Sequence, residues 1–178
     1  MSHKEEDVSY VNEQELMKYY NYNGIFGRFK LRLKLLKSWI LHSLAYSSMH
    51  SGFATTIQRA RGVKIGKNCH LCPYVQMDLI YPNLVQIGNN VTIGANVMIF
   101  AHANPTANLF LKKGPYPRKV EPVTIKNGAV LNPGSIITAG VTIGENSIVS
   151  VGSVVTQNIP DYSVVVGNPA RVVKTIER

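Results

Sequence analysis

Acidic residues are scarce in this sequence. Its 178 residues include 10 Asp and Glu against 19 Lys and Arg, which gives a formal net charge of +9 at pH 7. A chain with this charge attracts anions such as nucleic acid, an anionic bilayer or a phosphorylated cofactor. Two distant stretches, 28–37 and 112–119, hold nine of the 19 basic residues, with others near both ends of the repeat region, and no recognised nucleic-acid-binding motif is present. We therefore expect no nucleic-acid partner.

Cysteine is also scarce, and both cysteines lie in a single Cys69-x-x-Cys72 pair. One pair lacks the second set of ligands that a zinc knuckle needs, and a redox pair belongs at a strand–helix junction. No metal site is predicted. Two reduced thiols fit a cytoplasmic protein, and the charged N-terminus has no apolar signal-peptide core.

Long hydrophobic runs are missing too. Residues 38–58 carry no charge, but His42, His50 and many Ser and Thr residues interrupt the stretch, so no transmembrane helix is predicted. The preceding residues 28–37, followed by Trp39, form a basic segment with an aromatic anchor that suits peripheral contact with an anionic membrane surface. A helix that caps a solenoid end or packs on a neighbouring subunit would explain the segment equally well.

The sequence does contain a period of six residues. From Val123 to Ile159 an aliphatic residue returns at every sixth position, and a second, often small, residue follows four positions later. The aliphatic positions are Ile125, Leu131, Ile137, Ile143, Val149 and Val155. This period predicts a hexapeptide-repeat solenoid, in which each unit forms a short strand and a turn and three units close one triangular coil. A β-sandwich would instead alternate with period two.

An earlier block follows the same period, with two interruptions. Its aliphatic positions are Ile65, Leu71 and Met77 in one run and Ile87, Ile93 and Ile99 in another. Coils stacked about 4.8 Å apart would place residues 18 positions apart directly above one another. Gly and Asn after the aliphatic residue, as in Ile87-Gly88-Asn89-Asn90, suit turns with positive φ or local side-chain hydrogen bonds.

The longer interruption is an excursion loop, 101–122, with four prolines and one glycine, which we expect to contain no regular element. Long loops in compact folds are usually functional, and His102 stands at the root of this one. Histidine has an ordinary pKa near 6.5 and can accept a proton at neutral pH. The shorter interruption adds four residues between Met77 and Ile87. When they are discounted, Asp78 lies about one coil below His102, where it could orient the imidazole or bind an acceptor hydroxyl. A surface histidine and a turn aspartate are the alternatives.

Five motifs in residues 61–176 carry a family resemblance. They are Pro122-Val123-Thr124-Ile125, Asn132-Pro133-Gly134, Gly152-Ser153-Val154-Val155-Thr156, Ile159-Pro160 and Gly167-Asn168-Pro169-Ala170-Arg171-Val172. With these motifs the chain resembles the hexapeptide-repeat acyltransferases, most closely the maltose and galactoside O-acetyltransferase group and bacterial polysaccharide O-acetyltransferases. The resemblance implies an all-β left-handed parallel β-helix, a homotrimer, and active sites between subunits that bind acetyl-CoA.

The resemblance also implies roles for individual residues. His102 matches the catalytic base and Asp78 the acidic residue that binds the acceptor substrate. The positions matching the coenzyme A site are Pro133, Val151, Thr156, Gln157, Arg171 and Lys174. Arg171 and Lys174 would hold phosphate groups. Gln157 stands where the family usually has lysine.

Together these observations predict three regions. Residues 1–60 form a largely helical extension, residues 61–166 form the β-helix with its excursion loop 101–122, and residues 167–178 form a tail that completes the cofactor site. The predicted protein is a cytoplasmic acetyl-CoA-dependent O-acetyltransferase that acts on a sugar hydroxyl in surface polysaccharide or lipid-linked glycan synthesis. Peripheral contact with the inner face of the cell membrane is compatible with this prediction.

Three other functions remain open. The first is an N-acyltransferase that acts on a nucleotide-linked amino sugar. The second is a γ-class carbonic anhydrase, which shares the β-helix but needs three histidine ligands for zinc, whereas the solenoid has only His70 and His102. The third is a non-enzymatic assembly module that docks through its basic N-terminal segment.

Overall fold

The structure is a computed structural model that describes residues 7–177. The chain divides into two compact units. Within the described part, the first unit holds residues 7–37 and 104–118, and the second holds residues 38–103 and 119–177. The solenoid lies entirely in the second unit.

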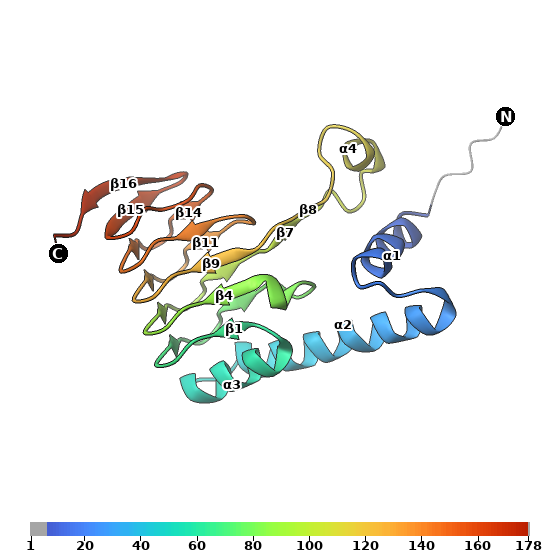
Figure 1. Cartoon of the computed structure of the whole chain (residues 1–178), viewed down its shortest axis with the longest axis horizontal. Helices are drawn as coiled ribbons and strands as arrows, with labels where there is room; N and C mark the ends of the chain where they lie inside the picture. The colour runs from blue at the N-terminus through green and yellow to red at the C-terminus, as the bar shows by residue number, and fades with distance from the viewer. Residues whose placement is uncertain (1–6, 178) are drawn as a thin grey trace. The chain divides into compact units, whose positions relative to one another are not determined.

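Three sheets form the three faces of the solenoid, and the strands stack along its axis in chain order (Figure 1). The first sheet has the order β1 (Lys64–Ile65), β4 (Val85–Ile87), β9 (Val123–Ile125) and β12 (Thr142–Ile143). The second has the order β16 (Ala170–Thr175), β15 (Ser163–Gly167), β13 (Ile148–Val149), β10 (Val130–Leu131), β5 (Thr92–Ile93) and β2 (His70–Leu71). The third has the order β14 (Val154–Val155), β11 (Ile136–Ile137), β6 (Met98–Ile99) and β3 (Gln76–Met77).

Successive strands of the chain enter different sheets, and neighbours within these sheets are parallel except for the antiparallel pair β15 and β16. This is a parallel β-helix, and the predicted left-handed hexapeptide-repeat fold class is confirmed.

The strand register keeps the interior residues stacked through both interruptions. Leu131 pairs with Val149, 18 positions later, as the uninterrupted period predicts. Leu71 pairs with Ile93, 22 positions later, because the four extra residues fall between them. Ile93 pairs with Leu131, 38 positions later, across the excursion loop. Both insertions therefore leave the solenoid at turns and do not shift its core.

The stacked aliphatic side chains fill the interior of the solenoid. Those exposed by 2% or less include Leu71, Met77, Ile93, Ile99, Ile125, Leu131, Ile137, Ile143, Val149 and Val155. Full burial of each side chain stabilises the fold by roughly 1.5–3 kcal/mol relative to exposure. Ile65 in the first coil is only half-buried. Two serines at the small fourth position have partners: Ser147 Oγ donates to Pro160 O at 2.7 Å, and Ser153 Oγ accepts from Gly167 N at 3.1 Å. Ser135 Oγ, at the same place in another unit, is buried without a hydrogen-bond partner among the described residues.

Asparagines and glycines meet different requirements in the turns. Asn90 and Asn146 adopt positive φ of 58° and 51°. Gly88 and Gly144 do not have positive φ, and they are required for a different reason. A Cβ at Gly144 would lie 2.3 Å from the backbone carbonyl of Pro160 in the next coil, and the corresponding approach exists at Gly88. The coils therefore stack too closely at these turns for any side chain.

Helix α3 (Ser51–Arg61) covers the N-terminal end of the solenoid, where it contacts β1 and β2. The Ser51 hydroxyl accepts a hydrogen bond from Leu71 N at 2.9 Å, and Arg59 Nε donates to Ile65 O at 3.1 Å. The helix ends at Gly62, whose φ of 114° requires glycine. The last part of α2 (Gly24–Tyr46), from Ser38 onward, belongs to the same unit, and Ser38 Oγ donates to Leu79 O at 2.6 Å.

The first unit joins α1 (Val8–Tyr19) and the start of α2 to the tip of the excursion loop. The expectation of an irregular excursion is wrong, because it contains α4 (Leu109–Lys113), and its root is an antiparallel pair of β7 (His102–Ala103) and β8 (Lys119–Val120). The prolines lie outside α4, and Asn108 caps that helix by accepting from Leu111 N at 3.0 Å. The 3-10 helix η1 (Pro82–Leu84) occupies the shorter insertion.

Charged and polar side chains hold the loop tip to α1. Lys112 Nζ lies 2.7 Å from Glu15 Oε2 and donates to Asn104 Oδ1 at 2.9 Å. Arg118 Nε lies 2.7 Å from the same Glu15 oxygen. The side chain of Lys112 is only 2% exposed, so its polar partners lie inside the unit with it. Within the first unit, the excursion loop is therefore a clamped segment.

Candidate active site

The structure brings His102 and Asp78 into direct contact. Asp78 follows β3, and His102 opens β7 at the root of the excursion loop. His102 Nδ1 lies 2.6 Å from Asp78 Oδ2. The aspartate side chain is fully buried, whereas the imidazole is 21% exposed. One partner is therefore fixed inside the fold and the other remains accessible.

Asp78 accepts hydrogen bonds on both carboxylate oxygens. Oδ1 accepts from Ile80 N and Tyr81 N, each at 2.9 Å, and Oδ2 accepts from Ala101 N at 2.8 Å as well as from His102. Burial alone would raise the Asp78 pKa, but the hydrogen bonds from His102 and from the backbone of Tyr81 and Ala101 bring the pKa below its ordinary value. Asp78 is therefore an ionised carboxylate in the folded chain.

An ionised carboxylate only accepts hydrogen bonds, so the Nδ1 atom of His102 must carry the proton of this contact. The Nε2 atom of the neutral ring then has a free lone pair. The ring of Tyr81 meets the imidazole edge-on, with centroids 5.3 Å apart, and restricts its rotation. This arrangement can take a proton from a bound hydroxyl or amine and hold the resulting imidazolium beside a carboxylate.

Arg61 holds the backbone next to the Asp78 side chain, and the sequence analysis did not predict this residue. Its Nη2 donates to Met77 O at 2.9 Å and to Asp78 O at 2.6 Å. Burial lowers the Arg61 pKa to about 10, although Asp78 acts in the opposite direction. Its Nε and Nη1 atoms are buried without a hydrogen-bond partner among the described residues. The repeat period holds no signal for Arg61, because it ends a helix instead of occupying a coil position.

A second histidine, His42, is buried near Arg61. His42 Nδ1 is 3.5 Å from Gln58 Nε2, and the His42 pKa is lowered to about 4 by burial and by the nearby Arg61 charge. His42 therefore stays neutral at ordinary pH and leaves the positive charge of this region to Arg61.

The six residues predicted to bind coenzyme A are all exposed and lie on the solenoid surface. Pro133 and Val151 belong to stacked turns between the second and third sheets, where Gly152 N donates to Pro133 O at 3.0 Å. Thr156 and Gln157 follow β14 at the next corner, which is also the corner at which Asp78 and His102 leave the third sheet.

Arg171 and Lys174 lie on β16, which pairs with β15 at the C-terminal edge of the second sheet. The structure thus places the six positions at two corners and one edge, and it brings only Pro133 and Val151 into adjacent turns.

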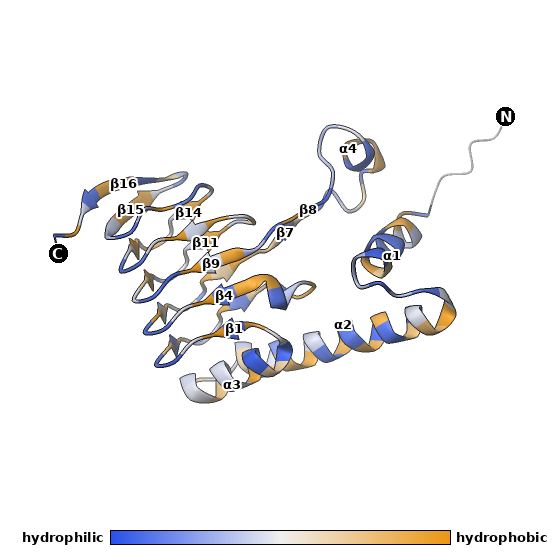
Figure 2. Ribbon diagram, in the orientation of Figure 1, coloured by the Kyte–Doolittle hydropathy of each residue, from blue (hydrophilic) through white to orange (hydrophobic). Residues whose placement is uncertain are grey.

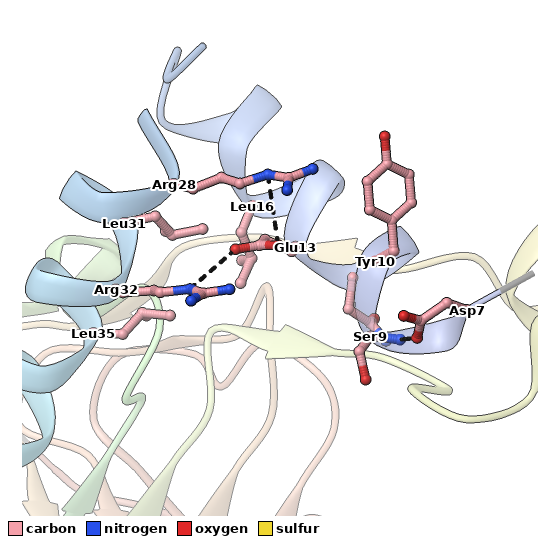
Figure 3. A pocket seen from close by; sticks show the side chains of 10 residues that line it. Asp7, Ser9, Tyr10, Glu13, Leu16, Arg28, Leu31, Arg32 and Leu35 are labelled. Carbon is pink, nitrogen blue, oxygen red and sulfur yellow. Dashed lines mark hydrogen bonds and ion pairs between the residues drawn. The ribbon is translucent and has the colours of Figure 1, made fainter. Parts of the chain in front are cut away.

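The two described grooves contain none of the predicted site residues. A groove of about 480 Å³ lies between α1 and α2 in the first unit, over Leu16, Leu31 and Leu35 (Figure 3). Its arginines already face Glu13, at 3.4 Å for Arg32 and 3.9 Å for Arg28. A groove of about 320 Å³ on the first sheet of the solenoid is lined mainly by polar residues, among them Lys64, Lys126 and Glu145.

Residues 7–177 include no helix that is long and apolar enough to cross a membrane. Over the same residues, no group of three or more His, Cys, Asp and Glu side chains could hold a metal ion. Both cysteines are free and half-buried.

Comparison with known proteins gives a family match within the solenoid, together with similar proteins and solved structures. Residues 85–101 and 122–157 match the family described as hexapeptide repeat of succinyl-transferase. Protein CapG of Staphylococcus aureus is 38% identical over 120 residues, which cover 67% of this chain and 69% of that protein. The galactoside O-acetyltransferase of Escherichia coli (strain K12) is 33% identical over 114 residues, 64% of this chain and 54% of the relative, so the match spans about half of that relative.

A solved structure of a galactoside acetyltransferase in complex with coenzyme A has a TM-score of 0.62 and 27% identity, and the match covers 83% of this chain and 82% of that chain. The family match stops at residue 101 and resumes at residue 122, so it flanks the excursion loop.

Proposed function

The chain belongs to the hexapeptide-repeat acetyltransferases, and from this premise we propose that it transfers the acetyl group of acetyl-CoA to a hydroxyl of a sugar. The observation that carries the proposal is the Asp78–His102 contact of 2.6 Å, in which a buried carboxylate orients a partly exposed imidazole. The sugar hydroxyl as acceptor is supported by similarity to galactoside O-acetyltransferases.

In the proposed reaction, His102 Nε2 takes the proton of the acceptor hydroxyl while that oxygen attacks the thioester carbonyl. The acetyl–sulfur bond then breaks, and the proton passes to the coenzyme A thiolate. Backbone N–H groups would stabilise the oxyanion. General-base catalysis contributes about 10²–10⁴-fold, and binding both substrates in one cleft contributes much of the rest. No covalent enzyme intermediate is needed.

We assign Asp78 to orienting the imidazole and stabilising its charged form. Its side chain is fully buried and accepts four hydrogen bonds, which supports this role over direct contact with the acceptor. The acceptor would then be held by exposed groups near His102.

Acetyl-CoA would be bound by residues from two corners of the solenoid. Pro133 and Val151 lie at the corner where the chain enters the third sheet, and Thr156 and Gln157 lie at the corner where it leaves that sheet. The strands of the third sheet therefore separate the two sets within one chain. A cleft in which two subunits contribute one corner each would serve a single ligand better, so we propose a homotrimer with active sites between subunits.

Arg171 and Lys174 of β16 would add charge for the cofactor phosphates, since both side chains are exposed. Surface polysaccharide or a lipid-linked glycan, modified in the cytoplasm, is the acceptor class that we propose.

The test is incubation of the purified chain with labelled acetyl-CoA and a panel of glycan precursors. We expect a labelled product that mild alkali hydrolyses, because the product is an ester. An alkali-resistant product would be an amide and would favour N-acylation of an amino sugar.

His102→Ala should reduce turnover about 10²–10⁴-fold and retain acetyl-CoA binding in a thermal shift assay. The matched control is His70→Ala, which removes an exposed histidine from the same solenoid and should keep full activity. Unchanged turnover in the His102 variant would refute the assignment.

A further inference from the structure

Helix α2 exposes a second apolar face in addition to the one that it buries. The buried side carries Leu31, Ser38, His42 and Ala45. In the first unit, a ladder of apolar residues on another side of the helix is 49–78% exposed, and it consists of Ile25, Phe29, Leu33 and Leu36. Steps of three or four residues keep these side chains on one face of a helix. Hydrophobic positions recur along the whole of α2 in Figure 2. We call this ladder the α2 stripe.

Basic residues border the α2 stripe, and α2 itself contains no acidic residue. The sequence of α2 contains five Lys and Arg and no Asp or Glu. At 100° per residue, Lys30 and Lys37 lie along one border and Arg32 along the other. Arg32 faces Glu13, but neither lysine forms an ion pair within residues 7–177. The uncompensated charge is therefore cationic and lies beside exposed apolar surface.

This combination decides between the possible occupants of the stripe. A second copy of α2 would bring one cationic border against another, which like-charge repulsion disfavours. An anionic bilayer offers headgroups to the lysines and an acyl boundary to the aliphatic and aromatic side chains. The exposed Trp39 is a residue type suited to the headgroup level, and the exposed Phe29 suits the apolar face of a helix that lies in the interface. The helix does not qualify as a membrane span, so it would lie in the plane of the interface.

We propose that the α2 stripe is a membrane-docking surface that lies flat on an anionic lipid bilayer. The proposal does not depend on the acetyltransferase reaction, since it rests only on the exposed residues of one helix. It would place the enzyme at the surface where lipid-linked substrates are present.

The test is co-sedimentation of the full chain with vesicles of phosphatidylglycerol and phosphatidylcholine, compared with vesicles of phosphatidylcholine alone. We expect binding to the anionic vesicles and little binding to the neutral ones. Added salt should weaken the binding, because it screens the lysine–headgroup attraction. Equal binding to both vesicle types, or to neither, would overturn the proposal.

Two sets of variants separate the apolar and charged parts. Phe29→Gln, Leu33→Gln and Leu36→Gln together should lower the partition coefficient by at least about tenfold, since the bilayer-facing apolar area is lost. The matched control is Val173→Gln, which changes a similarly exposed apolar residue on β16 and should not affect binding. These side chains are exposed, so circular dichroism and thermal unfolding should match the parent chain.

Lys30→Glu with Lys37→Glu should also lower binding to anionic vesicles at least about tenfold, because each basic residue near the surface contributes about fivefold. Lys64→Glu with Lys67→Glu reverses the same charge on the exposed solenoid and is the control. If the stripe variants leave vesicle binding unchanged but alter the molar mass by light scattering, a second protein copy covers the stripe and the proposal is wrong.

Discussion

Replacing Asp78 with Asn would test how the acid and the histidine cooperate. The carboxylate accepts two hydrogen bonds on each oxygen, from Ile80 N and Tyr81 N on one and from Ala101 N and His102 Nδ1 on the other. An asparagine amide offers one oxygen and one NH₂ group. Whichever way the amide turns, two N–H donors therefore face another donor.

The expected loss of stability follows from that count. Each buried donor left without a partner costs about 1–3 kcal/mol. The free energy of unfolding should therefore fall by about 2–6 kcal/mol if both donors stay unpaired, and by about 1–3 kcal/mol if the His102 ring changes tautomer and leaves only Ala101 N unpaired. If the amide oxygen faces the two backbone N–H groups of Ile80 and Tyr81, the NH₂ group forces the His102 proton onto Nε2. That tautomer cannot accept the substrate proton. Turnover should fall about 10²–10⁴-fold, while the Kd for acetyl-CoA stays close to that of the parent chain.

The assay combines denaturant unfolding with steady-state turnover of Asp78→Asn, His102→Ala and the double variant. Because Asp78 acts through His102, the double variant should turn over within about twofold of His102→Ala alone. Glu121→Gln is the control, because it neutralises a half-exposed carboxylate near the same loop root and should cost less than about 1 kcal/mol. Multiplicative losses of turnover in the double variant, or full turnover in Asp78→Asn, would refute the reasoning.

Three further perturbations follow from the structure. The pKa of His42 is about 4 in the folded chain against 6.5 when unfolded, so the contribution of this histidine to the free energy of unfolding is fully present above pH 6.5. That contribution declines by up to about 3 kcal/mol as the pH falls toward 4. His42→Asn should remove this pH dependence from unfolding experiments, and the control His70→Asn should not. Lys112→Met should release the loop tip from Glu15 and speed its amide hydrogen exchange, and unchanged exchange would show that the clamp is dispensable. Gly144→Ala should unfold at distinctly lower temperature, because the new Cβ meets backbone of the next coil.

The repeat made most of the solenoid predictable. A coil interior accepts one aliphatic residue per six positions, so the sequence from Val123 to Ile159 predicts which residues of neighbouring strands pair. The same arithmetic located the Asp78–His102 contact, because discounting the four inserted residues gave their vertical separation. Their catalytic roles and the coenzyme A positions remain predictions that the proposed assays address.

The rest of the candidate site could not be predicted from periodicity. Arg61 reaches the Asp78 carbonyl from the end of a helix, so its place depends on how α3 docks on the first coils. The clamp between Glu15 and Lys112 joins residues far apart in the chain through charge alone, and many other pairs of opposite charge were available. Helix α4 could not be predicted because its five residues are too few to show a helical period and prolines stand on both sides of it.

The pairings of Leu71 with Ile93 and of Ile93 with Leu131 carry a consequence for how such a scaffold can change. Since extra chain leaves and re-enters at a corner, a longer or shorter insert alters only the entropy of closing that loop, which grows slowly with length. Inserts at a corner can therefore be exchanged while the stacked aliphatic core of the solenoid stays unchanged. A designer wishing to graft a new recognition element would find tolerant positions at these junctions.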